Sequence, residues 1–127
     1  MGWKWNKVNK LSYLTVPSWE REGISIGFSS RLGGKSQKPY NSLNLGLHVG
    51  DSKVDVLNNR KEFLSLFDCS LKDCIIGEQV HGVKVENVTI EDCGKGAFDS
   101  DTALSETDGM LTTEHNVGLM SFFADCV

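Results

Sequence analysis

A histidine and a cysteine stand just beyond two apolar segments, where a side chain can reach into a cleft. His81 lies in Gln79-Val80-His81-Gly82, and the glycine after it lets the backbone turn away from the imidazole. Cys126 closes Ala124-Asp125-Cys126, which follows an apolar run. Singly each is weak evidence, because a lone histidine is more often a hydrogen-bonded structural residue and buried cysteine is common.

Together, His81 and Cys126 are compatible with two chemistries. In one, His81 draws the proton from Cys126 and the thiolate acts as a nucleophile. In the other, the thiolate and the imidazole bind zinc. Catalytic zinc usually has three protein ligands and an open position for water, and only two ligands are visible in this pattern. The residues alone leave both chemistries open.

The segment Ser30–Ser36 is rich in groups that bind anions. Arg31 offers a planar fork suited to phosphate, and Gly33 and Gly34 allow backbone N–H groups to approach a ligand closely. The spacing is not that of a Walker loop. As a pattern alone, a solvated turn is the simpler interpretation.

Apolar periodicity predicts the elements that must position these residues. The expected strands cover Leu11–Val16, Ile24–Ser29, Cys74–Val80, Val83–Ile90 and Val117–Phe123. The strand from Cys74 would deliver His81, and the last strand is apolar enough to be fully buried. A helix is expected over Lys53–Phe67, with Ser52 at its start. Two long polar stretches, Ser30–Asp51 and Asp92–Asp108, are expected to be loops, the first tied down by interleaved leucines.

Composition indicates a globular chain and excludes several function classes. The 127 residues, 39% apolar and 24% charged, fit one domain. The net charge of −4 and the lack of a basic stripe argue against nucleic acid as a partner. No apolar run approaches the ~20 residues of a membrane span, and no signal peptide is apparent, so the expected location is the cytoplasm. The other cysteines, Cys69, Cys74 and Cys93, are expected to be small reduced core residues.

Taken in order, several segments resemble the opening of the YfiH-like laccase-domain family. Gln79–Gly82 is similar to the Q-V-H-G motif of that family, and the stretch from Asp108 to Val127 resembles its D-A-L-V-T … A-D-C-V-P region. The remaining matching segments are Phe28–Ser36, Pro39–Asp51 and Asn59-Arg60. The resemblance covers nearly the whole chain from about Ile24. One departure is Asp108-Gly-Met-Leu-Thr112 in place of D-A-L-V-T.

The resemblance implies an α/β fold, a layered sandwich with mixed β-sheets. It also implies that His81 and Cys126 bind zinc together with a later histidine from an H-A-G-W-type motif. Neither His48 nor His115 corresponds to that third ligand. The family is associated with phosphorolysis of purine nucleosides and deamination of adenosine, and it carries an older copper polyphenol-oxidase label. Three histidines are too few for several copper sites, which favours zinc.

Four further expectations follow for this chain. Arg31 and Asn44 should line the same cleft as His81, with Arg31 holding phosphate. The substrates should be a purine nucleoside and phosphate. Because the chain stops after an apolar strand, residues 1–127 are expected to be a single partial domain, the amino-terminal half of a laccase-domain enzyme. On its own it should therefore bind zinc weakly, turn over little substrate and associate with itself or with a missing carboxyl half. The alternatives are a metal-free Cys–His hydrolase or amidase and an inactive interaction module.

Overall fold

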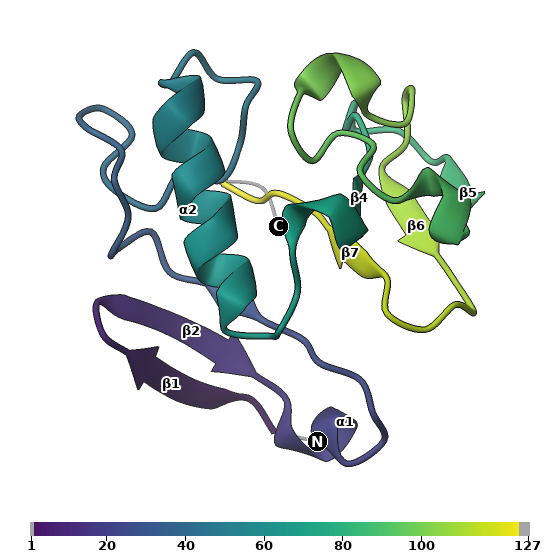
Figure 1. Ribbon diagram of the computed structural model, residues 1–127, viewed down its shortest axis with the longest axis horizontal. Coiled ribbons are helices and arrows are strands. Elements are labelled where there is room, and N and C mark those ends of the chain that lie inside the picture. Colours follow the sequence, from purple (N-terminus) through teal and green to yellow (C-terminus); the bar gives the residue numbers. More distant parts are fainter. Residues whose placement is uncertain (1, 125–127) are drawn as a thin grey trace. The chain divides into compact units, whose positions relative to one another are not determined.

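The computed structural model describes residues 2–124, which form two compact units (Figure 1). The first unit holds residues 2–45 and 50–63, and the second holds residues 46–49 and 64–124. The combination of helices with antiparallel and parallel sheets confirms the expected mixed α/β class. No helix within the described residues is both long enough and apolar enough to cross a membrane.

The first unit is built on a three-stranded antiparallel sheet in the order β1-β2-β3. Its strands are β1 (Lys4–Val8), β2 (Leu11–Thr15) and β3 (Phe28–Ser29), and the short helix α1 (Pro17–Glu20) follows β2. Along β2 the side chains of Leu11, Tyr13 and Thr15 are buried, and those between them are half-buried. This alternation is that of a strand with one face on the core.

Helix α2 (Lys53–Ser65) packs through Phe63 against the buried face of β2. The ring of Phe63 meets that of Tyr13 edge to face, with centroids 6.1 Å apart. The helix begins where the sequence predicted, and the Ser52 hydroxyl accepts the Asp55 N–H at 3.4 Å. It ends at Ser65, two residues before the predicted Phe67.

The second unit contains two parallel strand pairs, β4 with β7 and β5 with β6. The strands are β4 (Cys74–Ile76), β5 (Val85–Asn87), β6 (Gly109–Leu111) and β7 (Gly118–Met120). Single 3₁₀ turns lie at Leu71–Asp73, Ile90–Asp92 and Ser100–Thr102. All three residues of β4 are buried, so this strand is the centre of the second core.

Several predictions about strands need correction. The strands expected over 24–29, 74–80 and 83–90 cover only Phe28–Ser29, Cys74–Ile76 and Val85–Asn87, and strand β6 was not predicted. The hairpin strand β1 was not predicted, because its two lysines and one tryptophan leave both faces largely exposed and show no clear alternation. The apolar run Val117–Phe123 was expected to be fully buried, but β7 covers only three residues and Leu119 is 40% exposed. Within the described residues β7 pairs only with β4, which leaves its other edge uncovered.

Candidate active site around His81

The two segments that carry the predicted metal ligands leave the same end of one parallel strand pair. Cys74 pairs with Gly118, and Ile76 pairs with Met120. Parallel strands end at the same edge of a sheet. The segments that follow Ile76 and Met120 therefore leave this strand pair side by side, at the same edge (Figure 1). The first leads to His81 and the second toward Cys126.

His81 lies on a tight turn whose backbone N–H groups are hydrogen-bonded to the carboxylate of Asp108. The backbone φ of His81 is +58°, in the left-handed region that non-glycine residues rarely adopt. Asp108 accepts the backbone N–H groups of Val80 at 3.0 Å, His81 at 3.0 Å and Gly82 at 2.9 Å. Three donors on one carboxylate fix the unusual turn and present the exposed imidazole outward.

The hydrogen bonds also set the charge of Asp108. The N–H groups of Val80 and Gly82 are the main causes that lower the pKa of this carboxyl below its ordinary value of 3.8. The Asp108 side chain is therefore ionised across the neutral range. A negative charge thus stays fixed beneath the His81 turn.

Gln79 ties the His81 segment to the segment that leads to Cys126. Its side-chain amide donates to the carbonyl of Phe122 at 2.9 Å, and its carbonyl oxygen accepts the N–H of Phe122 at 2.7 Å. This two-way pairing imitates a strand contact beyond the last residues of β4 and β7. Phe122 also lies beside the ring of His48, with centroids 6.3 Å apart. The pairing fixes the path of the chain just before residue 124.

Cys126 lies outside the described residues, so its predicted closeness to His81 stays a prediction. Within residues 2–124, no three His, Cys, Asp or Glu side chains gather closely enough to hold a metal ion. The other three cysteines are free thiols, with Cys74 buried and Cys69 and Cys93 half-buried. Burial raises the pKa of both Cys74 and Cys93, which favours the neutral thiol expected of small core residues.

The predicted phosphate-binding residues lie in the first unit. Arg31 is exposed, and its guanidinium donates to the carbonyl of Asn41 at 3.3 Å. The backbone carbonyl of Arg31 accepts the N–H groups of Ser42 and Leu43 at 2.9 and 2.8 Å. The turn that carries Arg31 is therefore fixed by its own loop rather than being a freely solvated stretch.

Asn44 takes part in a polar cluster inside the same loop. Its side-chain amide donates to Asp51 at 3.1 Å, and Asp51 also accepts from the hydroxyl of Ser36 and from the N–H of Ser52. Burial by itself would raise the pKa of Asp51, but these hydrogen bonds outweigh it, and the pKa is lowered. Asn44 thus has a structural partner, and its predicted contact with substrate stays a prediction.

The buried polar face of α2 holds this loop in place. The Asn59 amide nitrogen donates to the Ser36 hydroxyl and to the carbonyls of Ser42 and Asn44, at 3.0, 3.3 and 2.9 Å. Its oxygen accepts the N–H of Lys35 at 2.7 Å. The fully buried Asn59 side chain therefore makes hydrogen bonds that the loop, which has no regular secondary structure here, does not make within itself.

Arg60, the next residue, is also buried. Its Nε donates to the carbonyl of Leu45 at 2.7 Å, which ties the far part of the loop to the helix. Asn59-Arg60 is thus an anchor for the loop.

The sequence motifs contain Gln79, Asp108 and Asn59, but their roles as anchors of the backbone were not predicted. A signal was present for the first two, since a polar residue two positions before the histidine, and an aspartate opening an apolar strand, are typical of groups that hold backbone. The Asn59 anchor had a weaker signal, an amide on the helix face that also carries the apolar Val56 and Phe63.

Comparison with known proteins agrees with the motifs. Residues 25–127 match the sequence profile of the family described as "Multi-copper polyphenol oxidoreductase laccase". The chain is 42% identical, over 121 residues, to the purine nucleoside phosphorylase YlmD of Bacillus subtilis, covering 91% of this chain and 44% of the relative. It is 44% identical, over 105 residues, to YlmD of Geobacillus stearothermophilus, covering 83% and 38%. The chain thus spans less than half the length of these curated relatives.

Two crystal structures share the fold. A hypothetical YfiH protein from Bacillus licheniformis matches with a TM-score of 0.83 at 35% identity, and YlmD from Geobacillus stearothermophilus matches with a TM-score of 0.83 at 36% identity. Each match covers 91% of this chain and 42% of the other chain. The resemblance seen in the motifs is confirmed, and the chain belongs to the multi-copper polyphenol oxidoreductase laccase family.

Proposed function

We propose that a protein built on this chain cleaves purine nucleosides by phosphorolysis, with His81 and Cys126 as two ligands of a zinc ion. The names of the curated relatives, purine nucleoside phosphorylases, support the reaction class. The family description points to a metal, although it names copper.

The observation that carries the proposal is the paired anchoring of two segments at one sheet edge. Asp108 holds the turn of His81, and Gln79 holds Phe122, four residues before Cys126. Metal ligands must be kept within a few tenths of an ångström of their positions, which requires anchors of this kind. A structural histidine would instead use its ring in a hydrogen bond, whereas the ring of His81 is exposed.

The donor set fits zinc better than copper oxidase chemistry. Imidazole and thiolate are ordinary zinc ligands, and zinc accepts a tetrahedral site without any redox change. When bound, such an ion lowers the pKa of water and polarises oxygen groups of a substrate. The ionised Asp108 stabilises the turn on which His81 is presented and adds negative charge near a cation.

Arg31 and Asn44 are proposed to hold phosphate and nucleoside. A guanidinium has five N–H donors, and in residues 2–124 that of Arg31 makes one hydrogen bond, to Asn41. Its remaining donors suit a phosphate oxygen pair. Phosphorolysis needs a bound phosphate beside the sugar carbon, so replacing Arg31 with alanine should weaken phosphate use more than nucleoside deamination.

Metal binding is tested on the chain itself with cobalt(II) as the probe. Thiolate coordination gives an intense near-ultraviolet charge-transfer band, which should appear in the wild type and vanish in Cys126→Ser. His81→Ala should weaken binding by about tenfold or more, whereas Cys93→Ser should leave the band intact. A band that persists in Cys126→Ser and disappears in Cys93→Ser would rule out the proposed ligand pair. A chain that binds no metal but hydrolyses amides through Cys126 would favour the metal-free alternative.

Because the chain alone is expected to turn over little substrate, the reaction is tested on a full-length version, with inosine and adenosine, with and without phosphate. Phosphorolysis releases the purine base only when phosphate is present. Adenosine deamination, the second activity proposed for the same site, releases ammonia without phosphate. Ammonia release that survives Arg31→Ala, together with lost base release, would support separate roles for Arg31 and the metal ligands. Equal losses in both activities would remove Arg31 from phosphate binding.

A further inference from the structure

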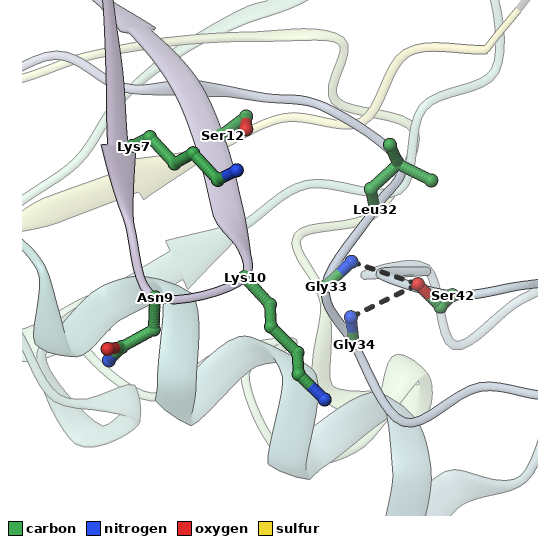
Figure 2. Close-up of a pocket in the computed structure, with 8 residues that line it drawn as sticks. All are labelled: Lys7, Asn9, Lys10, Ser12, Leu32, Gly33, Gly34 and Ser42. Atoms are coloured by element: carbon green, nitrogen blue, oxygen red, sulfur yellow. Dashed lines mark hydrogen bonds between the residues drawn. The ribbon is translucent and has the colours of Figure 1, made fainter.

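A shallow cavity of about 510 Å³, largely open to solvent, lies within the first unit, between the β1–β2 turn and the segment around Gly33 (Figure 2). Its volume is in the range of small-molecule sites. It is lined by residues of the hairpin and of the loop, namely Lys7, Asn9, Lys10, Ser12, Leu32, Gly33, Gly34 and Ser42. None of these residues has a role in the function proposed above.

The loop wall of the cavity is built by close backbone contact. A Cβ at Gly33 would come within 2.3 Å of the carbonyl oxygen of Lys10, and one at Gly34 within 2.2 Å of that of Ser42. The hydroxyl of Ser42 accepts both glycine N–H groups, at 3.0 and 3.2 Å (Figure 2). Loop and hairpin turn therefore form a preformed wall, which reduces the entropic cost of binding.

The cavity has positive charge in a chain that is acidic overall. Lys7 and Lys10 are the only ionisable side chains in its lining, and no carboxylate accompanies them. Within residues 2–124 neither ammonium group forms an ion pair. The first ten residues contain three lysines and no acidic residue, whereas the whole chain has a net charge of −4. Two unpaired ammonium groups around one hollow attract an anion and repel a cation.

An aromatic side chain extends the same face of the sheet. Side chains two residues apart in a strand point to the same side, so Trp5 lies beside Lys7 on β1. The register agrees, because Trp5 pairs with Leu14 and Lys7 with Ser12, which also lines the cavity. The side chain of Trp5 is 64% exposed. It is a flat surface on which a ring attached to the bound anion can stack.

We propose that this cavity binds the phosphate group of a small molecule, with Lys7 and Lys10 as the charged contacts. The hydroxyl of Ser12 and the amide of Asn9 are the neutral donors at the same hollow. Free phosphate and a nucleotide share this chemistry, and a nucleotide would in addition place its base on Trp5. The inference does not rely on His81, Cys126 or Arg31, so it stands or falls separately from the phosphorylase proposal.

Binding to the whole 127-residue chain is measured by calorimetry and by amide NMR shifts at low salt, with sodium phosphate, AMP and adenosine as probes. Phosphate and AMP should bind, should shift the amides of Gly33 and Gly34, and should weaken as salt is added. The double change Lys7→Gln and Lys10→Gln should weaken both anions by about tenfold or more, because contacts between charged groups are stronger than those between neutral ones. Lys4→Gln is the matched control, because Lys4 lies on the same strand but on its opposite face.

The Trp5→Ala variant distinguishes a nucleotide site from a site for inorganic phosphate. A several-fold loss for AMP with no change for inorganic phosphate would identify a nucleotide site, and equal affinities would identify a site for phosphate alone. Either result keeps the cavity as the binding place. Adenosine, which has no phosphate, should not bind at the same amides.

Two results would overturn the inference. One is unchanged phosphate affinity in the double lysine variant, with circular dichroism and thermal unfolding like those of the wild type. The other is loss of phosphate binding in Arg31→Ala but not in the double lysine variant, which would assign the anion to Arg31. If the double variant unfolds, the wild-type NMR map decides, because phosphate shifts that avoid residues 7–12 and 33–34 contradict the site.

Discussion

At the scale of single residues, the proposed metal site depends on side chains that bind backbone rather than substrate. Neither Gln79 nor Asp108 is proposed to bind the metal, yet their hydrogen bonds hold the two segments on which the proposed metal ligands lie. Residue type and the family resemblance pointed to His81 and Cys126, whose metal-binding roles stay a prediction. The sequence could not identify the anchors, because what Gln79 and Asp108 contact depends on how distant segments meet in the fold.

Replacing Asp108 with asparagine should loosen the His81 turn and reduce the acid sensitivity of the fold. An asparagine amide has one acceptor oxygen, and its NH₂ group would face backbone donors. The pKa of Asp108 is lowered in the folded state, so its stabilisation is fully present above the ordinary value of 3.8 and is lost as pH falls through the folded pKa. Hydrogen exchange at residues 80–82 should therefore speed up, and the unfolding midpoint should depend less on pH below about 4.

Asp101→Asn is the control for this change, since the Asp101 side chain makes no hydrogen bond to a backbone N–H in the described structure. It should leave exchange at residues 80–82 and the acid dependence as they are. If Asp108→Asn behaves in the same way, Asp108 does not hold the turn.

At the scale of elements, two adjacent residues of one helix hold a loop of about twenty residues. The prediction of α2 and of a tied-down loop over Ser30–Asp51 followed from apolar spacing, and both are confirmed. Leu43 is buried in the core, as expected of a loop held by its leucines. In addition, Asn59 and Arg60 hold the loop backbone from the buried face of the helix, which was not predicted.

Asn59→Ala should therefore destabilise the first unit by roughly 2–4 kcal/mol, because three acceptors and one donor lose their buried partner. Chemical denaturation with a tryptophan fluorescence readout measures the change. Asn58→Ala is the matched control, since Asn58 is the exposed neighbour on the same helix. A loss for Asn59→Ala no larger than that for Asn58→Ala would mean that the loop holds itself.

Gly33→Ala tests the contact between the loop and the β1–β2 turn. The residue has a φ of +98° and no room for a Cβ, so the substitution adds a clash to the backbone strain. Gly23→Ala supplies the comparison, because Gly23 has a φ of +80° but no atom within 4 Å of the position that a Cβ would take. Gly23→Ala should cost about 1 kcal/mol and Gly33→Ala at least about 2 kcal/mol more by thermal unfolding. Equal costs would show that the turn and the loop can separate.

At the scale of the whole molecule, the described residues expose apolar surface that was expected to be buried. The strand over Val117–Phe123 was recognised from its composition. Its burial could not be read from composition, because burial depends on neighbouring strands, and β7 has one such neighbour in the described structure. An uncovered strand edge with apolar side chains is a template for pairing with another chain.

Leu119→Lys should reduce self-association of the 127-residue chain. A lysine on an edge strand adds a charge that must be desolvated in any edge-to-edge contact. In sedimentation velocity experiments the wild type should form dimers or larger species as concentration rises, and the variant should need a several-fold higher concentration. Val54→Lys is the control, because Val54 is 68% exposed on α2 and away from any strand edge. A wild type that stays monomeric at millimolar concentration would contradict the prediction.

The parallel pairing of β4 with β7 has a consequence for how quickly the protein folds. Cys74 can meet Gly118 only after the whole segment from Gly77 to Val117 has been looped out, whereas β1 and β2 meet across a turn of two residues. Closing a long loop loses chain entropy before any contact repays it, so pairs of high contact order form slowly. The hairpin should gain amide protection early in pulse-labelling experiments, and β4 and β7 should gain it last. The edge that carries His81 would then be the final part of the fold to take shape.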